Sequence, residues 1–300
     1  MSEKYGNGAL LSPPDKRDYR ISRCMDIPAG GADGVIPRNF ECWIPKEIHD
    51  QGKTASCTAF AMSTIFSCIW HKLTGEDRNF STGYIYGNNL DDCYQGTGAY
   101  MRDVAKAVTK HGDILSALAD SNDEKPEAFR WFEKIYPKFK AYSKLLVKEY
   151  VRISDASEAR AFMYKYKIPL FCSLRLGDIS PLSSNPDGLH AVAMYKYSFN
   201  FGFACRNSWG KNNIPNLDYR NFKIFKEVWG MVPNENINFT DVEKDRWSYD
   251  AINEAAADGI VEGFPDGSFA PDEAVTREQT AVIWERMKRY MDENYRKADK

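Results

Sequence analysis

A short apolar segment that begins directly after a cysteine constrains the fold of this chain more than any other feature. Residues 58–70 are mostly apolar, with Ser63, Thr64 and Ser67 among them, and the segment is shorter than the ~20 apolar residues that cross a bilayer. It therefore predicts a buried helix of a globular domain. Cys57 then lies in the first turn of that helix, where unpaired N–H groups and the positive end of the helix dipole favour a thiolate over a thiol.

The composition allows one large core and a small second unit. The chain has 300 residues, of which 43% are hydrophobic and 14% aromatic, and domains usually hold about 100–200 residues. Its 40 Lys and Arg residues nearly balance its 42 Asp and Glu residues, and no basic stripe has the pattern of a phosphate-binding surface. We expect two domains and no nucleic-acid partner.

The spacing of the cysteines and histidines argues against a metal site. The seven cysteines include no Cys-x-x-Cys pair, and the four histidines are far apart, so the ligand spacing of a zinc site is missing. An odd number of cysteines, in a chain large enough to fold without cross-links, favours reduced thiols over a disulfide framework. The sequence predicts no metal and no cofactor.

Residues 1–35 have the character of an N-terminal arm or pro-segment. They are polar, with a Ser12-Pro13-Pro14-Asp15 turn and a glycine-rich run at 30–34 that disfavours regular structure. Residues 1–20 have neither a basic start with an apolar run nor a small-residue cleavage site, so no secretory signal is visible. The sequence predicts no transmembrane segment. An inhibitory role for the arm and a passive surface wrap are both open.

Residues 36–233 predict a domain in which helices come first and strands later. A second helix is expected over residues 100–111, with apolar side chains in helical spacing and Gly112 as its stop signal. Short aromatic and β-branched runs predict strands at 171–176, 190–197 and 201–205. This order indicates an α+β architecture.

His190 and Asn207 follow Cys57 at separations that suit a thiol-dependent active site. His190 starts a predicted strand 133 residues after Cys57 (190 minus 57), and Asn207 follows Cys57 by 150 residues (207 minus 57). A thiolate needs a group that protonates the leaving amine, and a side-chain oxygen can hold an imidazole by accepting its other N–H. Each residue alone would be an ordinary core or turn residue. Together, in this order, they predict a catalytic set.

These motifs give residues 36–233 a resemblance to the papain-like cysteine peptidases. The resemblance rests on Gln51-Gly-x-x-x-Ser-Cys-x-Ala-Phe, on His190-Ala-Val and on Asn207-Ser-Trp-Gly, and the separations of Cys, His and Asn match those of the family. It implies a two-lobed fold, with a helical lobe and a β-rich lobe, and hydrolysis of peptide or protein substrates.

The resemblance also implies roles for further residues. Gln51 would donate its side-chain amide to an oxyanion hole beside the Cys57 N–H, and Trp209 would shield the His–Asn hydrogen bond from water. Gly96 and Gly98 would border the bound substrate backbone. Thr54 and Thr58 replace a cysteine and a tryptophan that are frequent in the family. The first change removes a disulfide, and the second is associated with bacterial members.

After a predicted linker at 234–238, residues 239–300 predict a helix, a loop and a second helix. The first helix is expected over 247–258, with apolar positions at 247, 251, 252 and 255 or 256 and Gly259 as its end. Turn residues fill 263–269. A Thr-Arg-Glu-Gln capping box at 276–279 then opens a helix to about Met291.

This C-terminal segment resembles one S-layer homology repeat in the order of its aromatic, turn and capping residues. The resemblance implies binding of bacterial secondary cell-wall polysaccharide through Arg277, with Asp266 and Trp247 as further contacts. An arginine fork beside helix N–H groups suits an acidic sugar substituent. The alternative is that Arg277 and Asp266 are purely structural. A calcium loop is disfavoured because the alternating Asp/Asn ladder of an EF-hand is absent.

The repeat occurs once, whereas the family usually carries three copies that combine to form the sugar sites. Three chains in closed symmetry could supply the missing neighbours, so the sequence predicts a homotrimer through this module. The repeat implies a cell-wall or extracellular location. The absence of a visible signal leaves a cytoplasmic location or leaderless release as the alternative.

Taken together, the sequence predicts a cysteine-type endopeptidase with Cys57, His190, Asn207 and Gln51 in its active site and an acyl-enzyme intermediate. Two alternatives remain open. One is acyl-transferase or amidase chemistry on the same scaffold, and the other is a catalytically silent, wall-attached binding protein.

Overall fold

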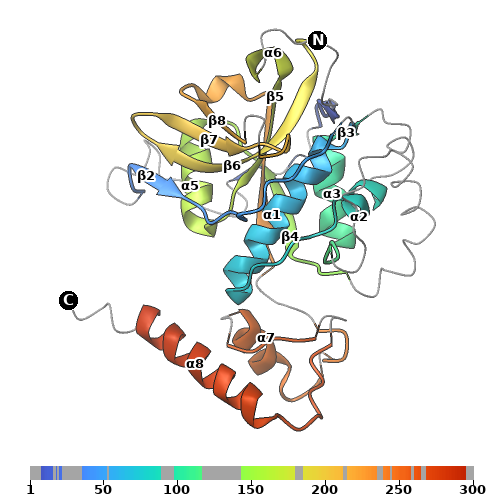
Figure 1. Ribbon diagram of the computed structural model, residues 1–300, viewed down its shortest axis with the longest axis vertical. Coiled ribbons are helices and arrows are strands. Elements are labelled where there is room, and N and C mark those ends of the chain that lie inside the picture. The colour runs from blue at the N-terminus through green and yellow to red at the C-terminus, as the bar shows by residue number, and fades with distance from the viewer. Residues whose placement is uncertain are drawn as a thin grey trace.

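The computed structural model shows a sheet-bearing part and a helical part that meet along helix α1, with a C-terminal module beyond them (Figure 1). The mixed α+β class expected from the sequence is confirmed. The structure describes residues 8–15, 18, 20–21, 36–52, 54–88, 98–116, 143–179, 185–211, 215–234, 239–243, 245–257, 260–264 and 268–294.

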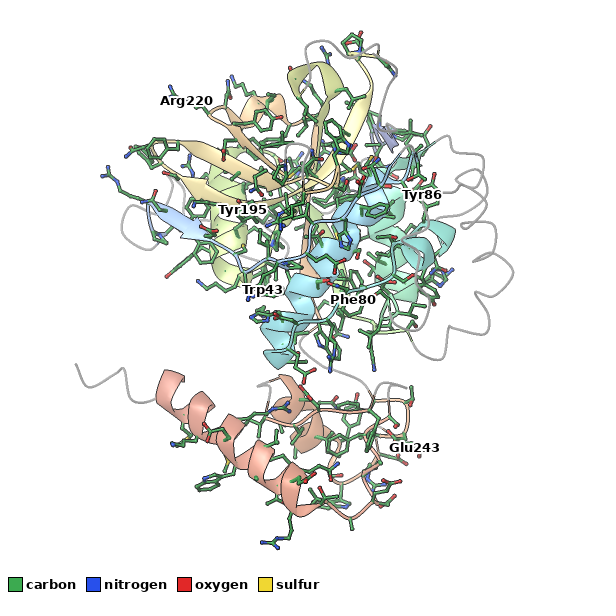
Figure 2. The ribbon with its side chains drawn as sticks, in the orientation of Figure 1. Trp43, Phe80, Tyr86, Tyr195, Arg220 and Glu243 are labelled. Carbon is green, nitrogen blue, oxygen red and sulfur yellow. The ribbon has the colours of Figure 1, made fainter. Side chains whose placement is uncertain are left out.

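The helical part is built around α1 (Cys57–Thr74), which starts where the sequence predicted. It is buried along most of its length because the sheet covers one side and α2 (Thr82–Asn88) and α3 (Met101–His111) cover the other. Near its far end, the Trp43 ring stacks on His71, with ring centroids 3.8 Å apart (Figure 2). Helix α3 ends before Gly112, as predicted.

None of the helices in the described part of the chain combines the length and apolar character needed to cross a membrane.

The sheet contains nine strands among the described residues, and β6 lies at its centre. Its main order is β3-β1-β6-β5-β9-β4, and β2, β7 and β8 extend it at the far end of β6. Each of β5, β6 and β7 begins and ends within one residue of the strand predicted from the sequence. The strands are β1 (Ala9–Leu10), β2 (Asn39–Glu41), β3 (Ala99–Tyr100), β4 (Val147–Arg152), β5 (Leu170–Arg175), β6 (Leu189–Ser198), β7 (Gly202–Arg206), β8 (Asn216–Tyr219) and β9 (Glu227–Pro233).

Helix α5 (Ala156–Tyr166) packs against β9 and completes the core on its side of the sheet. Asp155 caps its start by accepting hydrogen bonds from the N–H groups of Ser157 and Glu158. At Gly230 of β9 a β-carbon would lie 2.5 Å from the Phe162 ring, so the close approach of helix and sheet requires glycine there. Two short helices, α6 (Leu176–Ile179) and a 3₁₀ turn (Phe222–Ile224), complete this part.

The C-terminal module consists of α7 (Tyr249–Ala257), α8 (Arg277–Asn294) and the loops around them. The predicted capping box is present: Thr276 N–H donates to the Gln279 side-chain oxygen at 2.8 Å, and Gln279 N–H donates to the Thr276 hydroxyl at 3.1 Å. Asp241 accepts hydrogen bonds from Phe269 and Ala270 N–H, both at 2.7 Å, and so ties the start of the module to the loop before α8.

The expected apolar face of α7 is wrong at its first two positions. Trp247 precedes the helix and is 92% exposed, and Ala251 is also exposed. The helix instead buries Ile252, Asn253 and Ala256, a stripe with helical i, i+1, i+4 spacing that faces the loops of the module and the end of α1.

The module contacts the rest of the chain at the end of α1. The guanidinium of Arg286 on α8 lies 3.4 Å from a carboxylate oxygen of Glu76 and 3.0 Å from one of Glu262. Burial, together with the neighbouring Glu76 carboxylate, raises the pKa of Glu262 to about 6. One arginine thus bridges two acidic side chains across the contact.

Candidate active site

Cys57 is the first residue of α1, and its side chain is fully buried. Its sulfur accepts a hydrogen bond from Ala191 N–H at 3.4 Å, which places it beside the residue that follows His190. Burial raises the pKa of the Cys57 thiol to about 11, while N–H groups of Ala191, Gly8, Thr58 and Ala9 oppose this shift. The sequence led us to expect a stabilised thiolate. In the structure, the cost of desolvating a Cys57 thiolate outweighs the stabilisation that the start of the helix would give it, because Cys57 has no contact with water.

His190 lies near the start of β6 and is also fully buried. Its Nε2 is 2.7 Å from Oδ1 of Asn207. That oxygen also accepts Ser208 N–H at 2.8 Å, so it acts as an acceptor and Nε2 carries the proton. Nδ1 then has a lone pair, and it has no hydrogen-bond partner among the described residues. Burial lowers the pKa of His190 to about 4, against the effect of the Asn207 hydrogen bond.

Gln51 and Trp209 connect the loop before α1 to the turn that carries Asn207. The Gln51 side-chain nitrogen donates to the Thr54 carbonyl at 2.9 Å, and its oxygen accepts the Ser208 hydroxyl at 2.6 Å. Trp209 is 5% exposed, and its ring centroid lies 4.7 Å from that of His190. The structure therefore brings Cys57, His190, Asn207, Gln51 and Trp209 into one buried cluster.

The N-terminal arm covers this cluster, a feature that the sequence did not reveal. Strand β1 runs between β3, to which it is parallel, and Leu189 of β6, to which it is antiparallel. Ala99 N–H donates to the Gly8 carbonyl at 2.7 Å. Strand β1 of the arm therefore lies between the helical part and the sheet, next to the Cys57 sulfur. The site that the arm occupies is called the cleft below.

Gly8 fits this position because it has no side chain. A β-carbon there would lie 1.7 Å from the Ala55 carbonyl oxygen, closer than any packed contact allows. On the other side, Gly98 has φ +89°, and a β-carbon on it would lie 2.5 Å from the Gly8 carbonyl oxygen. Only glycine avoids the collision at position 8, and only glycine readily adopts the positive φ at position 98. Gly98 thus borders a strand lying in the cleft, whereas Gly96 falls outside the described residues.

Two charged residues that the sequence did not point to hold the arm: Arg102 of α3 and Glu227 of β9. Arg102 pairs with Asp18, and Glu227 accepts the Ser12 N–H. Of the two, only Glu227 stands out in the sequence, as a single acidic residue next to the apolar residues of a strand.

The predicted polysaccharide residues lie in the C-terminal module, away from this cluster. Arg277 is exposed at the first position of α8, and Trp247 is exposed before α7. Asp266 lies outside the described residues.

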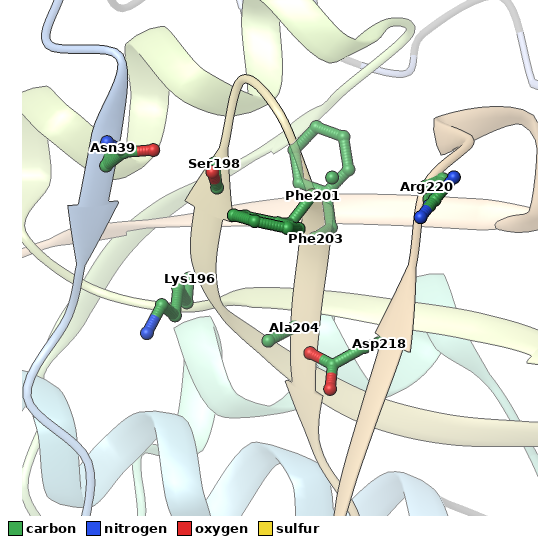
Figure 3. Close-up of a pocket in the computed structure, with 9 residues that line it drawn as sticks. Asn39, Lys196, Ser198, Phe201, Phe203, Ala204, Asp218 and Arg220 are labelled. Carbon is green, nitrogen blue, oxygen red and sulfur yellow. The ribbon is translucent and has the colours of Figure 1, made fainter.

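A separate open hollow of about 650 Å³ lies on the sheet at the far end of β6 (Figure 3). Phe201 and Phe203 border it together with polar side chains, among them Lys196, Asp218 and Arg220. The described residues that line it include no cysteine or histidine, and those on β6, Lys196 and Ser198, lie six and eight residues after His190. It is therefore not part of the candidate active site.

The arrangement of the sheet, α1 and the buried cluster defines a papain-like fold. Xylellain, a cysteine protease from Xylella fastidiosa, aligns with a TM-score of 0.60 and 20% identity over 76% of this chain and 96% of that one. The cysteine protease and lectin-like domains of Cwp84, a surface-layer-associated protein of Clostridium difficile, align with a TM-score of 0.58 and 12% identity over 80% of this chain and 58% of that one.

The C-terminal module matches a known family. Residues 238–281 match the S-layer homology domain. A surface-layer 125 kDa protein of Lysinibacillus sphaericus is 38% identical over 60 residues, and the outer membrane protein SlpA of Thermus thermophilus is 40% identical over 55 residues. These matches cover 20% and 18% of this chain but only 5% and 6% of those proteins. The chain thus joins an S-layer homology domain to a papain-like fold.

Proposed function

We propose that this protein is a cysteine peptidase that hydrolyses peptide bonds through an acyl-enzyme on Cys57. The observation that carries the proposal is the polar chain of the buried cluster. Asn207 holds the Nε2 side of His190 at 2.7 Å, and the Cys57 sulfur lies against the N–H of the next residue, Ala191, on the same strand. This arrangement leaves the lone pair on Nδ1 as the base.

The proposed reaction begins when the Cys57 thiol gives its proton to Nδ1 of His190. The thiolate attacks the carbonyl carbon of the scissile bond, and the oxygen takes the negative charge beside the Cys57 N–H and the Gln51 side-chain amide. The C–N bond then breaks, and the leaving amine takes the proton from His190. Water, deprotonated by His190, attacks the thioester, which releases the carboxylic acid and restores the thiol.

We expect the arm to restrain this activity. It covers the Cys57 sulfur and keeps both reacting groups away from water, and the resulting pKa values of about 11 for Cys57 and about 4 for His190 favour a neutral pair. Departure of the arm would let water and substrate reach the pair, which removes the main cause of both shifts.

A thiol-directed epoxide inhibitor tests the proposal. It should label Cys57 of a full-length Gly8→Leu protein, in which the new side chain collides with Ala55 and displaces the arm. Peptide mapping by mass spectrometry would identify the labelled cysteine. Labelling restricted to other cysteines, or none at all, would support a catalytically silent binding protein. Product analysis with an added amine would separate peptidase from acyl-transferase or amidase chemistry.

We further propose that the S-layer homology domain attaches the protein to bacterial cell-wall polysaccharide. The proposal is supported by the family match at residues 238–281 and by the exposure of Arg277 at the start of α8. Co-sedimentation with purified wall polysaccharide should fall at least tenfold for Arg277→Ala. The control is Lys288→Ala, which removes an exposed positive charge from the same helix and should bind normally. Equal binding of the two variants would assign Arg277 to structure alone.

A further inference from the structure

The arm makes contacts beyond the cysteine that show what the wall of the cleft can recognise. After β1, residues Ser12, Pro13 and Asp18 lie against Arg102, the second residue of α3. Ser12 also lies against Glu227, the first residue of β9. Arg102 from the helical part and Glu227 from the sheet carry opposite charges, and both therefore hold the same segment of the arm.

Arg102 holds the arm through both its backbone and its guanidinium. Its N–H donates to the Ser12 hydroxyl at 3.0 Å, and one guanidinium nitrogen donates to the Pro13 carbonyl. The guanidinium also meets the two carboxylate oxygens of Asp18 at 2.6 and 2.8 Å. The Arg102 and Asp18 side chains are only 15% and 20% exposed. One of these contacts, from a terminal guanidinium nitrogen to Asp18 at 2.8 Å, is a hydrogen bond, and the other is an ion-pair contact. An arginine–carboxylate ion pair that is this well shielded favours a carboxylate over an amide.

Glu227 uses its two oxygens differently. One oxygen accepts the Trp229 indole N–H at 2.7 Å and lies 3.2 Å from the Arg152 guanidinium. The other accepts the Ser12 N–H at 2.9 Å. The charge of Glu227 is therefore matched by Arg152, and its remaining oxygen contacts the main chain of the segment in the cleft.

Each of the two charged residues that hold the arm has a partner while the arm is in place. Arg102 pairs with Asp18, and Glu227 pairs with Arg152. Once the arm leaves, the guanidinium of Arg102, which lies 6.0 Å from the Trp229 ring centre, loses its carboxylate. A peptide with an acidic side chain at this point would restore the pair, whereas its amide counterpart would leave the arginine without a counter-charge.

We propose that Arg102 determines the substrate specificity of the cleft by selecting peptides with an acidic side chain. The arm then acts as a stand-in for such a peptide, with Asp18 supplying the carboxylate and Ser12 N–H the main-chain donor for Glu227. This inference rests on the proposed peptidase function.

The experiment uses full-length Gly8→Leu protein, whose arm is displaced. Internally quenched peptides are made in pairs that differ only by Asp against Asn, at each position within about ten residues of the cleaved bond. At one position kcat/KM should be at least tenfold higher for the acidic member. Arg102→Gln in this background should bring that ratio to about one, and Arg102→Lys should give an intermediate ratio because a point charge replaces a fork.

Lys106→Gln provides the matched control. Lys106 lies one helical turn after Arg102 on α3 and is exposed, so its replacement removes the same charge without touching the cleft. It should preserve the acid preference. Equal loss of preference in the Lys106 and Arg102 variants would show long-range attraction only and overturn the inference, as would an undiminished ratio in Arg102→Gln.

Calorimetric binding of the same peptide pair to a Gly8→Leu, Cys57→Ala protein separates this inference from the proposed function. A tenfold preference for the acidic peptide without hydrolysis by the Cys57-containing protein would contradict the peptidase and support the role of Arg102. Hydrolysis with equal rates and equal binding for both peptides would support the peptidase and overturn the role of Arg102. Failure of both peptides to bind or react would overturn both.

Discussion

In the proposed mechanism, the residues Cys57 and His190 form one proton-transfer path, so the loss of either would remove the whole covalent route. We predict that Cys57→Ala and His190→Ala each abolish peptide hydrolysis in the arm-displaced Gly8→Leu protein. Circular dichroism and thermal melting should show that both variants remain folded. Normal turnover by Cys57→Ala would contradict the proposed peptidase.

Gln51 should act on the rate and not on substrate binding, because its amide meets charge that develops only in the transition state. We predict that Gln51→Ala lowers kcat by roughly a hundredfold or more with little change in KM. Ser208→Ala is the control, since it removes the hydrogen bond to the Gln51 side-chain oxygen and keeps the amide. If both variants lose activity equally, Gln51 acts through loop structure.

The thiol of Cys57 should show the effect of the arm in its pH dependence. Because burial raises its pKa to about 11, the thiolate forms in the full-length protein only as the pH rises toward 11. We predict that the rate of Cys57 alkylation by iodoacetamide, followed by peptide mapping, rises about tenfold per pH unit through neutral and mildly alkaline pH. In Gly8→Leu the rate should level off at a lower pH. Identical profiles would mean that the arm does not set this pKa.

These residues also show how far sequence reasoning reached. Cys57, His190 and Asn207 could be grouped as candidate residues because the proposed chemistry imposes an order and a spacing that are visible in the linear sequence. The raised pKa of Cys57 could not be predicted, because burial in the folded protein raises it, and the sequence does not show which segments cover the thiol. Arg102 and Glu227 were missed for the same reason: their partners are defined only by the folded arm.

At the scale of elements, the arm is the segment whose removal should matter most for activity. We predict that a protein starting at Val35 hydrolyses peptides faster than the full-length chain, in a direct comparison of kcat/KM. Full-length Gly8→Leu is the control, because it displaces β1 and keeps every other residue. Ile21 of the arm is 1% exposed, so the shortened protein should also melt at a lower temperature. Equal activity of the full-length chain, the shortened protein and Gly8→Leu would mean that the arm only covers the surface and does not restrain activity.

The helices and strands differ in how well the sequence specified them. Helices α1 and α3 follow the predictions because each has a clear apolar pattern and a glycine at its end. Strand β1 was not foreseen, since two residues of a polar arm become a strand only between the edges of β3 and β6. Strand β9 was also unassigned, because its buried Glu227 and its Gly230 interrupt the apolar run.

At the scale of the whole molecule, α8 has an apolar stripe that the rest of the described chain leaves exposed. Trp284, Met287 and Met291 are 64%, 37% and 50% exposed, and their i, i+3, i+7 spacing puts them on one face. Such a face fits packing against a copy of itself. On this basis we propose the homotrimer expected from the single repeat, with each Arg277 in a groove shared with the next chain.

We therefore predict concentration-dependent association of the full-length protein in light scattering, and a monomer for a protein ending at Pro233. Trp284→Glu should dissociate the full-length assembly, and Glu285→Lys, a charge change at an exposed position on another face of the same helix, should not. A full-length protein that stays monomeric at all concentrations and still binds wall polysaccharide tightly would contradict the shared groove.

Helix α1 separates the two ends of the molecule that matter for function. Cys57 begins the helix, and Glu76, just beyond its other end, contacts Arg286 of the C-terminal module. Eighteen helical residues span about 27 Å. If that module held the chain on a surface, the length of α1 would set the distance between the surface and the scissile bond. Substrates would then be chosen by their distance from the wall as well as by their sequence.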